Sequence, residues 1–192
     1  MSTTRARLVQ MAFEMFGRNG FHGVGLDRII KEAGVSKQTF YNHFESKDDL
    51  VLAVLTHRHE AESKVLGDLM LSLGGDTPRG RLYAIFDALD AWMNEPDWRG
   101  CIFMTAAAEF PMHTDPAHQS AAAHSKASQE AIQYLATLAR ARDPELLARQ
   151  LSILIAGTIA CRHTTGDERC AETAKCVAHK LLDEQLPADD ET

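Results

Sequence analysis

The sequence predicts an all-helical protein of about nine helices. Apolar residues recur at intervals of three and four along most of the 192 residues, which is the spacing of a helix face. Three helices begin with the same signal, a capping residue followed by a proline, at Thr77-Pro78, Asp115-Pro116 and Asp143-Pro144. No segment shows the sustained alternation of apolar and polar residues, rich in Val, Ile and Thr, that is typical of a strand.

Glycines and capping residues mark the first three helices. We expect the first helix to close at Gly20 and the second to run over about residues 26–33, up to Gly34. Ser36 is expected to open the third helix, over about residues 37–42, because its hydroxyl can accept hydrogen bonds from N–H groups of the first turn.

A long fourth helix and five further helices follow. Ser46 with Asp49 three residues later is a capping-box pattern, and apolar residues on a helical period extend this helix to about Leu73. Its length is then roughly 40 Å at about 1.5 Å per residue. The later helices are bounded by the cap-and-proline signals and by glycine or proline: one from Pro78, one over 100–110, one from Pro116, and two over about 144–164 and 168–186.

The charge of the chain is unevenly distributed. The net charge is −7, which by itself argues against binding to a nucleic acid. Residues 1–60, however, contain 8 Lys and Arg against 7 Asp and Glu, whereas residues 61–192 contain 12 against 20. Any contact with DNA is therefore expected to be local and to be made by the N-terminal segment.

The composition predicts a cytoplasmic protein that is not an enzyme. No apolar run approaches the roughly 20 residues of a membrane span, and the first residues lack the apolar stretch of a secretory signal. The GxSxG, HExxH, P-loop and Rossmann glycine motifs are absent, so we expect neither catalysis nor a cofactor. The cysteines match no metal-ligand spacing, so we expect reduced thiols and no metal: Cys101, Cys161, Cys170 and Cys176.

Residues 21–47 carry the strongest functional signal. Two short helices flank the turn Ala33-Gly34-Val35, where small side chains let the helices cross closely and glycine can take a positive φ. The outward face of the second of these helices carries hydrogen-bond donors and no acid: Lys37, Gln38, Thr39, Tyr41, Asn42 and His43. Base edges in the major groove and phosphates accept such hydrogen bonds, so the stretch predicts a helix-turn-helix that binds double-stranded DNA.

In this region the sequence resembles the TetR family of bacterial transcriptional regulators. The resemblance covers about residues 5–55 and is carried by Phe13, Phe16, Gly20, Ile29, Ala33-Gly34-Val35-Ser36, Thr39-Phe40-Tyr41-Asn42-His43-Phe44 and Lys47-Asp48-Asp49-Leu50. It implies a helix-turn-helix domain over residues 1–46, joined by a long helix to a helical effector-binding and dimerisation domain over residues 47–192.

The resemblance also implies roles for individual residues. Phosphate contacts are expected from Tyr41 and Lys47, and base contacts from within residues 36–42. Ser36 therefore joins the side chains of the outward face as a candidate for DNA contact. The position that opens the second helix, often Ser or Thr in the family, is Gly25 here, so only a backbone contact to phosphate is expected from it.

Met and aromatic side chains between residues 92 and 112 suggest an adaptable apolar pocket. The alternative for each residue alone is ordinary core packing. Polar anchors are expected from Asn94, Glu109, His113 and Tyr134, none of which dominates, so an uncharged or weakly polar organic effector is favoured. The apolar candidates are Trp92, Met93, Trp98, Phe103, Met104, Phe110 and Met112.

The last two helices each carry an apolar stripe, which the resemblance assigns to a homodimer interface. The alternative is that both stripes pack inside one chain. The first stripe consists of Leu147, Leu151, Leu154, Ile155 and Thr158, and the second includes Ala174, Val177, Ala178 and Leu181.

Together these features predict a ligand-responsive repressor. A small, mostly apolar molecule would bind the C-terminal domain and release the dimer from a palindromic operator, without a membrane partner. Two alternatives stay open: a thiol- or metal-responsive regulator of the same fold, and a helical carrier of hydrophobic ligands with no role on DNA.

Overall fold

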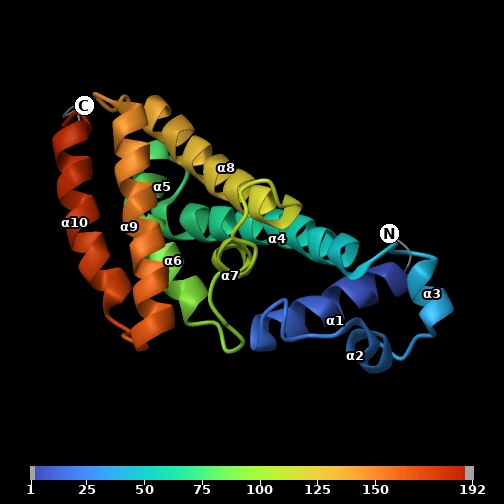
Figure 1. The fold of residues 1–192 in the computed structure, drawn as a ribbon. Coiled ribbons are helices and arrows are strands. Elements are labelled where there is room, and N and C mark those ends of the chain that lie inside the picture. The colour runs from blue at the N-terminus through green and yellow to red at the C-terminus, as the bar shows by residue number, and fades with distance from the viewer. Residues whose placement is uncertain (1–2, 189–192) are drawn as a thin grey trace. The chain divides into compact units, whose positions relative to one another are not determined.

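The chain is described by a computed structural model over residues 3–188, and these residues contain helices and no strand (Figure 1), which confirms the predicted fold class. The positions Met1, Ser2 and 189–192, which fall within the predicted domains, lie outside the described residues. The helices are α1 (Thr3–Asn19), α2 (Leu26–Glu32), α3 (Lys37–Tyr41), α4 (Lys47–Gly74), α5 (Pro78–Tyr83), α6 (Ile85–Met93), α7 (Ile102–Glu109), α8 (Pro116–Leu138), α9 (Pro144–Thr165) and α10 (Cys170–Gln185).

The predicted helix starts are present as hydrogen-bonded caps. The side-chain oxygens of Ser36, Thr77 and Asp143 each accept a backbone N–H three residues later, at 3.0 Å. One helix was not expected, because the segment after Thr77 is divided into α5 and α6 at Ala84. The ψ angle of Ala84 is −5°, which interrupts the helix, and neither proline nor glycine marks this position in the sequence.

The helices form two compact units, and α4 and α8 contribute to both. Unit 1 comprises the chain up to Ala61 together with Cys101–His124, and unit 2 comprises Glu62–Gly100 together with the chain from Ser125 onward. These units are defined by contacts between helices. The predicted boundary between a DNA-binding domain over residues 1–46 and an effector-binding domain over residues 47–192 separates functions, and it stays a prediction.

Aromatic side chains form the centre of unit 1. Phe16, Phe21, Phe40 and Phe44 are fully buried, and the ring centroids of Phe16 and Phe21 are 4.9 Å apart. Phe40 lies 5.5 Å from Phe44, so the short helix α3 is anchored by its single buried residue. This packing presents the opposite face of α3 to solvent.

In unit 2, α10 packs against α5, α6 and α9. Lys175 of α10 donates to both carboxylate oxygens of Asp87 on α6, at 2.6 and 2.7 Å. Helix α9 is long and apolar enough, by length and composition alone, to cross a membrane, although only 22% of its most apolar 18-residue window is buried. This helix was expected over about residues 144–164, but not as a segment of that length and apolarity, because Arg149 and Arg162 interrupt its apolar runs.

Candidate nucleic-acid interface

The exposed face of α3 brings together the predicted DNA-contacting side chains. Helices α2 and α3 are joined by a turn in which Gly34 has a φ of +63°, a conformation that favours glycine. Phe40 points into the core, whereas the side chains of Ser36, Lys37, Gln38, Tyr41 and Asn42 are exposed, and those of Thr39 and His43 are half-buried.

Hydrogen bonds hold several of these side chains in place. Gln38 Nε2 donates to Asn42 Oδ1 at 3.1 Å, one helical turn away. Lys37 Nζ lies 2.8 Å from a carboxylate oxygen of Asp27, and this hydrogen bond and the negative charge of Asp27 raise the pKa of Lys37. We call the predicted helix-turn-helix domain of residues 1–46 the head. DNA that binds to this face would have to compete with contacts already made inside the head.

Lys47 makes a contact that the sequence did not indicate. Its Nζ donates to the backbone carbonyl of Phe21 at 2.6 Å, which ties the start of α4 to the turn between α1 and α2. An ammonium group has three N–H donors, so one internal hydrogen bond leaves donors for a phosphate.

Gly25 occupies the N-cap of α2 with φ −77° and ψ 148°, an extended conformation that any residue adopts. A Cβ at this position would meet no atom within 4 Å. The backbone therefore does not require glycine here, and the expected difference from the family is confined to the missing hydroxyl.

Glu109, which was expected as a polar anchor for an effector, makes two hydrogen bonds to the turn between α1 and α2. Its carboxylate oxygens accept the backbone N–H groups of Phe21 at 3.0 Å and of His22 at 2.7 Å. Sequence reasoning missed this role because the partners are 88 and 87 residues apart and no local pattern connects them.

The predicted effector-pocket residues are distributed over both units. In unit 2, Trp92 and Met93 are buried in α6, Trp98 packs edge-on against Trp92, and Tyr134 is 65% exposed. In unit 1, Phe103 is buried, Phe110 is half-buried, and three residues are exposed: Met104, Met112 and His113.

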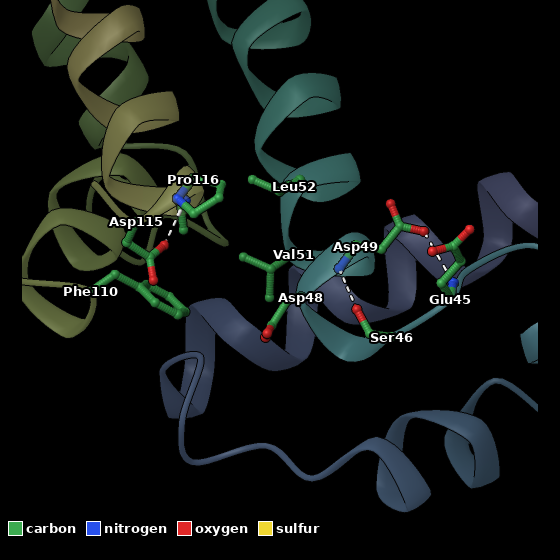
Figure 2. Close-up of a pocket in the computed structure, with 10 residues that line it drawn as sticks. Glu45, Ser46, Asp48, Asp49, Val51, Leu52, Phe110, Asp115 and Pro116 are labelled. Carbon is green, nitrogen blue, oxygen red and sulfur yellow. Dashed lines mark hydrogen bonds between the residues drawn. The ribbon is translucent and has the colours of Figure 1, made fainter. Parts of the chain in front are cut away.

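A pocket of 480 Å³ lies in unit 1, between the beginnings of α4 and α8. Of the predicted pocket residues only Phe110 lines it, and Figure 2 shows Phe110 with Asp115 on one side and Val51 with Asp48 on the other. Two of the lining acids accept backbone N–H groups at the helix starts: Asp49 accepts the N–H of Glu45 at 3.2 Å, and Asp115 accepts that of Ala117 at 2.8 Å. Helix N-termini favour such carboxylates, so helix capping accounts for Asp49 and Asp115 in this lining.

A histidine pair connects α4 with α8 within unit 1. The Nδ1 atoms of His59 and His124 are 2.9 Å apart, and the ring of His124 stacks on Phe103 at a centroid distance of 3.7 Å. Burial, and next the positive charge of His59, lower the pKa of His124 to about 4.

Acidification is expected to destabilise the chain through His124. Its pKa of about 4 in the folded chain is below the roughly 6.5 expected after unfolding, so between these values the unfolded chain binds more protons. The free energy of unfolding should fall as the pH drops through about 6.5, by about 1–2 kcal/mol after allowance for solvent screening. Urea unfolding at pH 7.5 and pH 5 measures this loss. The variant His124→Gln should lose less stability than the wild type, and equal losses would contradict the assignment.

The predicted interface residues of α9 and α10 are divided between core and surface. Leu147, Leu151, Thr158 and Ala178 are buried inside unit 2, whereas Leu154, Ile155, Ala174 and Leu181 are half-buried, and Val177 is 45% exposed. Ile153, which lies outside the predicted stripe, is 67% exposed. Ile153, Ala156, Gly157 and Cys161 follow one another at helical spacing, and we call this exposed stripe the α9 face.

All four cysteines are free thiols. Cys101 and Cys170 are buried, and burial raises the pKa of Cys170, whereas Cys161 and Cys176 are exposed. Among the described residues, no group of three or more His, Cys, Asp or Glu side chains is placed to hold a metal ion.

Comparison with known proteins gives matches in both halves of the chain. Residues 8–54 match the family model "Bacterial regulatory proteins, tetR family". Residues 78–178, more than half of the chain, match "Tetracyclin repressor-like, C-terminal domain".

Curated relatives match over shorter stretches. The transcriptional activator FasR of Mycolicibacterium smegmatis is 49% identical over 55 residues, 29% of this chain and 25% of its own length. The transcriptional repressor NemR of Escherichia coli K12 is 30% identical over 107 residues, 55% of this chain and 53% of its own length. The chain thus spans from a quarter to about half of the length of these relatives.

Solved structures match over nearly the whole chain. SCO4454, a TetR-family regulator from Streptomyces coelicolor, is 29% identical with a TM-score of 0.85, covering 96% of this chain and 97% of its own. The sav143 chain of Streptomyces avermitilis is 30% identical with a TM-score of 0.82, covering 96% and 98%. The helix-turn-helix, the helical fold and these matches together show that the chain belongs to the TetR family of transcriptional regulators.

Proposed function

We propose that the chain is a ligand-responsive repressor that binds DNA through α3 and the residues around it. The observation that carries the proposal is the exposed face from Ser36 to His43, which is rich in hydrogen-bond donors, contains no acid and is held by the buried Phe40. Gly25 and Lys47 are the flanking candidates for phosphate contact. The acidic remainder of the chain favours DNA contact confined to this head.

We infer a homodimer that reads a palindromic operator in the cytoplasm. Its support is the α9 face, where Ile153 is exposed on a helix whose most apolar window is only 22% buried. Ala156 and Gly157 on this face would let a second helix approach closely. Two chains related by a two-fold axis would bring two recognition helices to successive turns of the major groove.

The effector in this proposal is a small, mostly apolar molecule that binds within residues 47–192. Two arrangements of the chain are compared, one that binds DNA and one that does not. The effector must have the higher affinity for the arrangement that does not bind DNA, because only differential affinity shifts the equilibrium. Repression is supported by the similarity to NemR, whose name is that of a repressor, and this match extends beyond the head to 55% of the chain.

Selection of bound duplexes from a random DNA pool tests the proposal. We expect the selected duplexes to share an inverted repeat with half-sites about one helical turn apart. Failure to enrich any sequence, or enrichment of a site without two-fold symmetry, would contradict the dimeric DNA-binding role.

Replacing Lys47 with alanine tests whether this residue contacts a DNA phosphate in addition to the carbonyl of Phe21. If Lys47 binds a phosphate, Lys47→Ala should weaken binding to all duplexes and flatten the plot of log affinity against log salt by about one unit. Titrations at several salt concentrations measure this slope. An unchanged slope with weaker binding would restrict Lys47 to holding the carbonyl of Phe21.

A further inference from the structure

The turn between α1 and α2 is held by two side chains from other parts of unit 1. Glu109, at the end of α7, accepts the N–H of Phe21 through Oε1 at 3.0 Å and the N–H of His22 through Oε2 at 2.7 Å. On the other side of the same peptide segment, Lys47 Nζ donates to the carbonyl of Phe21 at 2.6 Å. One carboxylate and one ammonium group therefore bind the backbone of two consecutive residues. Hydrogen bonds to charged groups are the stronger class.

The turn is shaped to admit the carboxylate. Gly20 has a φ of +71°, and a Cβ at this position would lie 2.3 Å from Glu109 Oε1. The ring of Phe110 packs against those of Phe21 and His22, with centroids 5.6 and 4.8 Å apart. The ring of His22 also meets the backbone carbonyl of Glu109, at 2.9 Å from Nε2. Polar and aromatic contacts thus join the end of α7 to this one turn.

We propose that Glu109 is a positioning residue for DNA binding, because its hold on the N–H groups of Phe21 and His22 sets the path of the turn that leads into Gly25 and α2. The turn is short, so a shift at Phe21 moves the N-terminus of α2 and, through the interhelical turn, α3. Glu109 does not itself contact DNA in this role, since phosphates repel a carboxylate. The inference rests on the proposed function and assigns the end of α7 as the support of the turn that leads into α2.

Replacing Glu109 with glutamine has two effects on DNA affinity that are expected to have opposite signs. Glu109→Gln keeps the shape of the side chain, but its NH₂ group cannot accept a backbone N–H, so one of the two hydrogen bonds is lost. Removing a negative charge should by itself strengthen DNA binding through electrostatics. Glu60→Gln, on an exposed side chain of α4, removes the same charge elsewhere in unit 1 and serves as the matched control.

The experiment uses the full chain and a duplex selected by the wild type from a random pool. We expect Glu109→Gln to bind about tenfold more weakly than the wild type, the scale of one hydrogen bond to a charged group. Glu60→Gln should bind as tightly as the wild type or more tightly. Glu109→Asp, which keeps the carboxylate on a shorter side chain, should lie between wild type and Glu109→Gln.

A stoichiometric titration separates positioning from folding. Positioning predicts that all of the Glu109→Gln protein is active, and folded by far-UV circular dichroism, but binds with a weaker Kd. A purely structural role predicts a loss of binding that is matched by a loss of the folded fraction in circular dichroism. That second result, or binding by Glu109→Gln as tight as that of Glu60→Gln, would overturn the inference. If neither the wild type nor Glu60→Gln binds any duplex, the proposed function itself fails.

Discussion

Substituting Ile153 with glutamate is expected to dissociate the proposed homodimer and to abolish binding to the palindromic DNA that we propose as its operator. Ile153 is 67% exposed on the α9 face, and a two-fold axis through that face would bury it in both subunits. Each dimer of Ile153→Glu would then bury two unpaired carboxylates at a cost of several kcal/mol each, which raises the dimer Kd by at least about a thousandfold. A monomer contacts one half-site only, so the affinity for the operator falls when the dimer dissociates.

Sedimentation of the purified chain at micromolar concentration measures this effect. Leu138→Glu is a matched control, because Leu138 is 49% exposed but lies at the end of α8, outside the α9 face. The control should remain dimeric, and far-UV circular dichroism should show that both variants are folded. A dimer of Ile153→Glu that binds the operator as the wild type does would exclude the α9 face as the interface.

The second large effect is expected from two neighbouring aromatic residues on α3. Phe40 is fully buried and is the only buried residue of this helix, so Phe40→Ala should cost about 3–5 kcal/mol and disorder the recognition helix. Tyr41 is 53% exposed, so Tyr41→Ala should cost less than about 1 kcal/mol of stability. DNA binding should nevertheless weaken by about tenfold, because Tyr41 is expected to contact a phosphate.

Urea unfolding and DNA titration together measure this contrast. Circular dichroism is the suitable probe, because Trp92 and Trp98 lie in unit 2 and their fluorescence does not report directly on the head. Phe40→Ala should lower both stability and DNA affinity, and Tyr41→Ala should lower affinity alone. Equal losses of stability in the two variants would contradict the orientation of α3.

Local signals in the sequence predicted the fold well. Ser36, Thr77 and Asp143 cap helices because capping depends on atoms three residues apart, which a sequence pattern displays directly. The break at Ala84 left no such signal, so α5 and α6 were expected as one helix.

Long-range features of the site could not be predicted. The hold of Glu109 on Phe21 depends on tertiary packing across 88 residues, and Lys47 reaches the same residue across 26. The apolar stripe expected as an interface contained Leu147 and Leu151, which are core, because helical periodicity identifies an apolar face without showing what covers it. The sequence predicts helix caps at Ser46 and Asp115, which the hydrogen bonds confirm, but the pocket that these residues line depends on the packing of α4 beside α8.

Hydrogen exchange with and without the selected duplex shows where DNA contacts the chain. We propose that this contact is confined to the head, on the face from Ser36 to His43 with Gly25 and Lys47 beside it. We predict that bound DNA slows exchange of backbone amides within residues 25–47 and leaves those of α9 and α10 unchanged. Slowed exchange in α9 or α10 without any change within residues 25–47 would contradict it.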